Sequence, residues 1–70
     1  MTRAQKITFI EKIKPNVRFI TDRTTHNRLV IDIIVIDGEA SVYNRSPKTQ
    51  LDALHVVDKI FNEIIKSGDF

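Results

Sequence analysis

Apolar and polar residues alternate with a period of two through the middle of the chain, a pattern typical of β-strands. The alternation covers residues 17–22, 29–36 and 39–43. Asp37-Gly38 separates the second run from the third, and an Asp-Gly pair favours the two-residue turn of a β-hairpin. The polar residues 23–28 join the first two runs as a second hairpin loop. The pattern therefore predicts three antiparallel strands.

A two-residue turn fixes the register of the second hairpin, with Ile36 opposite Glu39. A slip by one residue would bury Asp32 and Glu39, so this register is favoured. One face is then wholly apolar and is predicted to meet the core: Leu29, Ile31, Ile33, Val35, Ala40 and Val42. The opposite, mixed face is predicted to point outward: Val30, Asp32, Ile34, Ile36, Glu39, Ser41 and Tyr43.

The last third of the chain has the spacing of one helical face. Ser46 supplies an N-cap hydroxyl and Pro47 suits the first helical position, while Gly68 can close the helix in a left-handed cap. The apolar positions of this predicted helix are Leu51, Leu54, Val57, Ile60, Phe61, Ile64 and Ile65.

The first fourteen residues allow two interpretations. Thr2 and Gln5 fit a capping box that opens a helix with an isoleucine stripe. Ile7 and Phe9 also fit a strand that ends at residues 14–16. We favour the helix, which gives an α+β fold of order α-β-β-β-α, a three-stranded antiparallel sheet with helices on one face; the alternative order is ββββα. Residues 1–70 form a single domain.

Composition narrows the class of protein. The 70 residues are 41% hydrophobic and 29% charged and contain no cysteine, which excludes a disulfide scaffold, cysteine-ligated zinc and thiol catalysis. No apolar run approaches the about 18 residues of a membrane span, and no secretory signal is recognisable. We expect a cytoplasmic domain with a small core, which a homodimer would help to stabilise.

The residues that catalysis needs are not grouped in this sequence. The only glycines are Gly38 and Gly68, so no glycine-rich phosphate loop exists. His26 and His55 are 29 positions apart and lack a metal-ligand spacing. We therefore expect a non-enzymatic binding module with no cofactor and no metal, in contact with RNA or with protein.

Two candidate surfaces follow. The predicted outward face of the sheet carries too many apolar residues for a face meant only for water, so it is a candidate protein interface: Ile20, Val30, Ile34, Ile36 and Tyr43. The second surface combines the 23–28 loop with the start of the last helix, where backbone N–H groups and basic side chains favour phosphate: Arg23, His26, Arg28, Arg45 and Lys48.

The strand and helix order resembles the double-stranded-RNA-binding domain, with His26 in the first hairpin loop and Ser46-Pro47-Lys48 at the start of the last helix. The run Asp22–His26 and the helical run Ala53–Ile60 resemble the ribosome hibernation-promoting factor family more strongly. That resemblance implies binding in the decoding channel of the small ribosomal subunit, which blocks messenger and transfer RNA. It assigns RNA contacts to Arg23, His26 and Lys59.

Two functional hypotheses remain. The first is an RNA-contacting, ribosome-associated module that regulates translation by steric occlusion. The second is a small protein-binding inhibitor or adaptor, for example a phage-encoded antagonist of a host enzyme, which uses the apolar outward face of the sheet.

Overall fold

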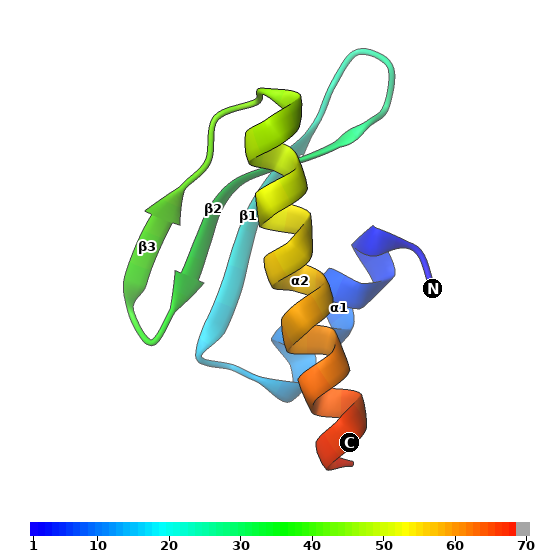
Figure 1. Ribbon diagram of the computed structural model, residues 1–70, viewed down its shortest axis with the longest axis vertical. Coiled ribbons are helices and arrows are strands. Elements are labelled where there is room, and N and C mark those ends of the chain that lie inside the picture. The colour runs from blue at the N-terminus through cyan, green and yellow to red at the C-terminus, as the bar shows by residue number, and fades with distance from the viewer. Residues whose placement is uncertain (69–70) are drawn as a thin grey trace.

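The computed structural model describes residues 1–68 and has the order α-β-β-β-α (Figure 1). The elements are α1 (Arg3–Ile13), β1 (Val17–Arg23), β2 (Leu29–Ile36), β3 (Glu39–Val42) and α2 (Pro47–Ser67). The strands form one antiparallel sheet in the order β1-β2-β3. The predicted α+β class and element order are confirmed, and the alternative ββββα order was wrong.

Local capping explains why the first segment is a helix. The Thr2 Oγ1 accepts from the Gln5 N–H at 3.1 Å, and the Thr2 N–H donates to the Gln5 Oε1 at 2.8 Å. These two bonds satisfy backbone donors that a helix start otherwise leaves without partners. Ile7 and Ile10, three positions apart, then face the core together. The strand alternative offers neither advantage.

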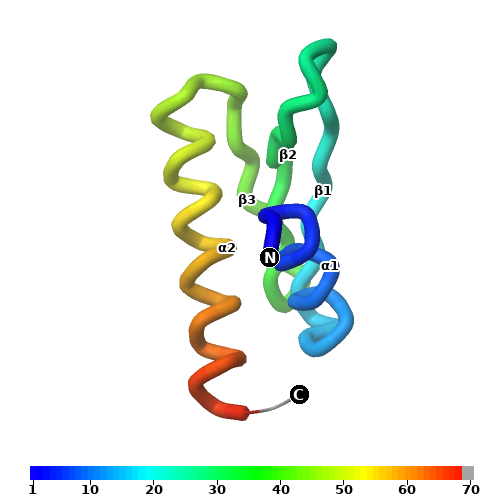
Figure 2. The backbone as a smooth tube through the Cα atoms, turned by 90° about the vertical axis from the view of Figure 1, so that its right-hand side faces the viewer, coloured from blue at the N-terminus to red at the C-terminus, as the bar shows by residue number. Residues whose placement is uncertain are grey.

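The ends of α2 are also those that the sequence predicts. The Ser46 hydroxyl accepts from the Thr49 N–H, Pro47 opens the helix, and Gly68 caps it with a φ of 72°. Figure 2 shows α2 as a separate layer on one side of the sheet. The other helix, α1, lies at the β1 edge and packs against both β1 and α2.

Both helices contribute to one hydrophobic core. Its buried members are Ile7, Ile10, Val17, Phe19, Ile31, Ile34, Ala53, Val57 and Ile64. The rings of Phe9 and Phe61 meet edge to face at 5.6 Å between centroids, and the Lys6 ammonium pairs with Asp58 at 3.2 Å. These contacts join α1 to α2. Within residues 1–68, neither helix covers the opposite face of the sheet.

The β2–β3 register is confirmed, with Ile36 opposite Glu39 and Ile33 opposite Val42. The turn takes positive φ values of 52° at Asp37 and 83° at Gly38, as a two-residue hairpin turn requires.

The prediction of which sheet face meets the core was wrong beyond the bulge in β2. Ile20 pairs with Ile33 and Thr21 pairs with Ile31, so the intervening Asp32 is an extra residue. A bulge turns two consecutive side chains to the same face. Asp32 and Ile33 therefore both point away from the helices, while Ile31 and Ile34 are 0% and 1% exposed in the core.

Several apolar residues that were predicted in the core lie outside it. Leu29 and Ile31 remain on the helix side, as predicted. The others lie on the face that the helices leave open: Ile33, Val35, Ala40 and Val42. Val42 is 79% exposed.

The side chain of Gln50, in the first turns of α2, completes the sheet where β3 has ended. The Gln50 Nε2 donates to the Ile31 C=O at 2.8 Å, and the Ile31 N–H donates to the Gln50 Oε1 at 2.9 Å. A neighbouring strand would make the same pair of bonds. This side chain therefore ties the start of α2 to β2.

No helix within residues 1–68 combines the length and apolar character needed to cross a membrane.

Candidate binding surfaces

The first candidate surface is the sheet face away from the helices, which we call the outer face: Ile20, Ile33, Val35, Ala40 and Val42. Ile20, Ile33 and Val42 stand side by side across β1, β2 and β3. Side chains directly opposite one another in a sheet lie about 5 Å apart, so this row is continuous. Ile20 is 50% exposed and Val42 79% exposed. The row is apolar surface in contact with water.

The predicted protein interface does not form one surface. Ile34 is a core residue and Tyr43 packs against the core. Beyond the bulge, both side chains point to the side of the sheet on which the helices lie. Ile36 also faces the α2 side, where it lines the same hollow as Val56. Val30 is only 6% exposed. Of the predicted set, Ile20 alone belongs to the exposed outer face.

A charged cluster stands beside the bulge. The Arg45 Nη2 lies 3.1 Å from the Asp22 Oδ2 and 3.0 Å from the Asp32 Oδ2, and its Nε donates to the Asp32 Oδ1 at 3.2 Å. The backbone N–H of Arg23 and the Arg45 guanidinium lower the pKa of Asp22. Asp32 and Asp22 raise the pKa of Arg45. Arg45 is therefore already paired with two acids.

The second candidate surface is at the end of the molecule where the β1–β2 loop and the start of α2 both lie (Figure 1, Figure 2). A bond from the Thr24 N–H to the Arg28 C=O and a φ of 60° at Asn27 shape the loop. His26, Arg28 and Lys48 are exposed, and the Arg23 Nη1 donates to the Asn27 C=O at 3.0 Å.

The predicted RNA-binding residues are only partly brought together. Arg23, His26 and Arg28 share the loop end of the molecule with Lys48 and Arg45. Lys59 is twelve positions after the start of α2 and lines a separate hollow of about 360 Å³ with Lys14.

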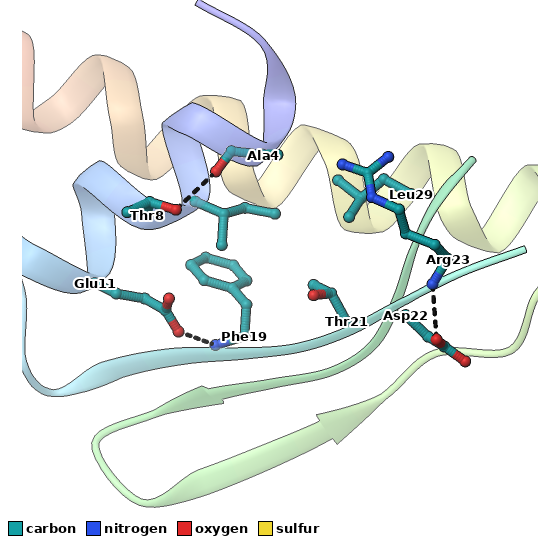
Figure 3. Close-up of a pocket in the computed structure, with 9 residues that line it drawn as sticks. Ala4, Thr8, Glu11, Phe19, Thr21, Asp22, Arg23 and Leu29 are labelled. Atoms are coloured by element: carbon teal, nitrogen blue, oxygen red, sulfur yellow. Dashed lines mark hydrogen bonds between the residues drawn. The ribbon is translucent and has the colours of Figure 1, made fainter. Parts of the chain in front are cut away.

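A third candidate surface is a hollow of about 380 Å³ between α1 and β1 (Figure 3), which we call the α1–β1 groove. The Glu11 Oε2 accepts the Phe19 N–H at 3.0 Å near one end, and Arg23 stands at the other. Thr8 and Thr21 supply hydroxyl groups between these ends. The groove was missed in the sequence, because its walls come from two elements with no shared motif.

One sequence signal for the outer face was available. Asp32 is the only charged residue in the apolar strand Leu29–Ile36. A lone acid at such a position is a sign that the alternation breaks there. The same acid also constrains the register of the hairpin, so the sequence alone does not separate a register constraint from a bulge.

In the part of the chain that the structure describes, no three His, Cys, Asp or Glu side chains are grouped to hold a metal ion.

Comparisons with protein-family models, with curated proteins and with solved structures find no match to this chain. The resemblance to ribosome hibernation-promoting factors therefore stays a prediction from the sequence.

Proposed function

We propose that this chain is a non-enzymatic protein-recognition module that docks on a partner protein through the outer face of its sheet. The observation that carries the proposal is the continuous row of Ile20, Ile33 and Val42, which neither helix covers within residues 1–68. A contiguous apolar patch on a small domain marks a contact site, since its exposure to water is unfavourable.

The size of the face limits the kind of contact. Three strands about 4.8 Å apart and about five residues of 3.3 Å make a face of roughly 14 by 17 Å. A stable interface buries about 800 Å² on each partner, which is several times this footprint. The outer face therefore serves as the apolar centre of a larger interface, and the partner also contacts its charged rim.

Arg18 defines part of that rim. It lies in the row with Val35 and Ala40, is exposed, and forms no ion pair with any residue of the part described by the structure. We infer a partner surface with an apolar centre and a carboxylate that meets Arg18. The guanidinium fork suits a carboxylate, which can accept two of its hydrogen bonds.

Site-specific photo-crosslinking tests the proposal. The crosslinker is placed at Val42 on the outer face and, as a matched control, at Leu51 on α2, which is 51% exposed. We expect one protein to crosslink from position 42 and not from 51. The captured protein is then purified, and Val42→Lys should weaken its binding at least tenfold while Leu51→Lys leaves it unchanged.

Three results would contradict this proposal. One is equal crosslinking from both positions, and another is normal binding by Val42→Lys. The third is capture of a second copy of this chain alone, which would make the outer face a homodimer interface.

RNA contact is the second candidate function. It is favoured by the grouping of Arg23, Arg28 and Lys48 at the end of the molecule that holds the β1–β2 loop and the start of α2. Arg45 is already paired with Asp22 and Asp32, so about three cations remain for phosphates. Three neutralised phosphates give a log–log salt slope of about −2 to −3.

Binding to purified ribosomes and to duplex RNA, measured over a range of salt concentration, tests this second function. Arg28→Gln should reduce the affinity and flatten the salt slope by about one. Arg18→Gln, on the outer face, is the matched control and should change neither. An affinity that does not depend on salt would exclude phosphate contacts.

A further inference from the structure

We propose that the α1–β1 groove binds the free carboxyl terminus of an extended peptide, which adds to the open edge of β1. This site is separate from the outer face and does not rest on the proposed function. Peptides commonly bind by adding a strand to an exposed sheet edge, where main-chain hydrogen bonds give affinity and side-chain pockets give selectivity.

The backbone of β1 supplies the edge. In the strand order β1-β2-β3, β1 has a partner on one side only. The N–H of Phe19 points away from β2, because it donates to the Glu11 carboxylate on α1. In a strand the backbone groups alternate, so the N–H and C=O of Thr21 also point away from β2. Thr21 lines the groove, so these groups are available to a peptide.

The two halves of α1 make different contacts with this edge of β1. Glu11, near the end of α1, occupies the N–H of Phe19 and blocks pairing there. Ala4 and Thr8, in the first half of α1, form the far wall of the hollow opposite Thr21 (Figure 3). The Asp22 Oδ1 accepts the Arg23 N–H at 2.8 Å, so the edge is occupied at Phe19 and at Arg23 and is open at Thr21, between them.

Apolar side chains give the groove its floor. Ile7 from α1 and Phe19 from β1 are 6% and 8% exposed, and Leu29 of β2 lies beyond them (Figure 3). An aliphatic side chain of the ligand would bury its surface on these three residues. Phe19 to Arg23 is four residue steps, or about 13 Å of strand, so the groove spans about four extended residues, of which one pairs with the open backbone groups of Thr21.

The charges at its ends set the direction of the peptide. The Arg23 guanidinium uses one nitrogen on the Asn27 C=O, and its other N–H groups form no bond within residues 1–68. The N-terminal half of α1 lies on the same side, and a helix N-terminus carries positive potential. Glu11 places negative charge at the opposite end. A peptide that runs parallel to β1 brings its carboxylate to Arg23.

The same charges argue against a polyanion in this groove. Glu11 and Asp22 both line it, so a nucleic acid backbone would meet two carboxylates. A single carboxylate on an apolar chain brings one negative charge, which meets the Arg23 guanidinium, while the neighbouring Asp22 carboxylate is already bonded to the Arg23 N–H and to Arg45. A free carboxyl terminus fits this arrangement because its charge sits on the backbone itself, at the end of the added strand.

Amide NMR titration of the full chain tests the proposal. The probe is a pool of N-acetylated tetrapeptides with an aliphatic last residue and a free carboxylate. We expect the largest shift changes at Ile7, Thr21 and Arg23. The same pool with amidated termini should bind at least tenfold more weakly, and so should Arg23→Gln with the carboxylate pool.

Arg28→Gln is the matched control, since Arg28 belongs to the same hairpin and does not line the groove. It should bind the carboxylate pool normally, as should Val42→Lys on the outer face. Equal binding of the amidated pool would overturn the proposal. So would shift changes confined to Ile20 and Val42, or no shift change at millimolar peptide.

Discussion

At the scale of single residues, the bulge at Asp32 determines which side chains of β2 face the core. Its carboxylate bonds to Arg45 on the outer side, and the bulge at this position reverses the alternation of β2. Sequence periodicity predicts the strand and its register because both are local. It does not predict the face, because burial of Ile34 in place of Ile33 depends on a bulge and on the helices.

Two alanine substitutions test this exchange of faces. Ile34→Ala removes a side chain that is 1% exposed, so we expect unfolding to become easier by about 2–5 kcal/mol. Val42→Ala removes one that is 79% exposed, and the change should stay within about 0.5 kcal/mol. Urea denaturation measures both. A larger effect at position 42 than at 34 would restore the face predicted from the sequence.

The pH response of Asp22 is a second residue-scale prediction. The N–H of Arg23 and then the Arg45 guanidinium lower its pKa below 3.8, the ordinary value for aspartate. Stability from these bonds is fully present above 3.8 and is lost as the pH falls through the lower, folded-state pKa.

Carboxyl NMR titration measures the Asp22 pKa directly. Arg45→Gln should raise it part of the way to 3.8, because the larger contribution from the Arg23 N–H remains. The control is Arg28→Gln, which should leave it unchanged. No change in Arg45→Gln would mean that the Arg45–Asp22 pair does not form in solution.

At the scale of elements, the ends of the two helices could be predicted because each is set by its own neighbours in sequence. Thr2 with Gln5, Ser46 with Pro47, and Gly68 act over four residues or fewer. The link from Gln50 to Ile31 spans 19 positions and has no local signature. For the same reason the α1–β1 groove, which needs α1 to lie beside β1, could not be predicted.

Removal of the Gln50 amide tests its place in the sheet. Gln50→Ala leaves the N–H and C=O of Ile31 without these partners in a half-buried position, which costs about 1–3 kcal/mol of stability. Hydrogen exchange of the Ile31 amide should accelerate. Asn62→Ala, an exposed position on α2, is the control and should change neither quantity. Unchanged exchange at Ile31 would show that water replaces the amide without cost.

At the scale of the whole molecule, the small core makes each internal contact important. A domain of this size has about 4–10 kcal/mol of stability in total. Ile10 is fully buried where α1 meets the rest of the core, and α1 also closes the β1 edge at Phe19. The attachment of α1 therefore stabilises the fold and forms one wall of the α1–β1 groove.

Loss of the Ile10 side chain should loosen the entire molecule. We expect Ile10→Ala to cost about 3 kcal/mol, which lowers the Tm by about 12–24 °C in a domain of this length. Ile65→Ala, at a position that is 46% exposed, is the comparison and should shift the Tm by only a few degrees. Thermal unfolding followed by circular dichroism measures both. A small effect at Ile10 would mean that α1 is not firmly docked.

The Gln50 amide also limits how the chain can rearrange. A longer β3 would need the N–H and C=O of Ile31 that this amide already occupies, and Gln50 holds the Asn44 C=O at 2.8 Å as well. The connection between Val42 and Ser46 therefore stays a linker as long as α2 keeps its present start. The side chain that fixes the start of α2 therefore also sets the point at which β3 stops.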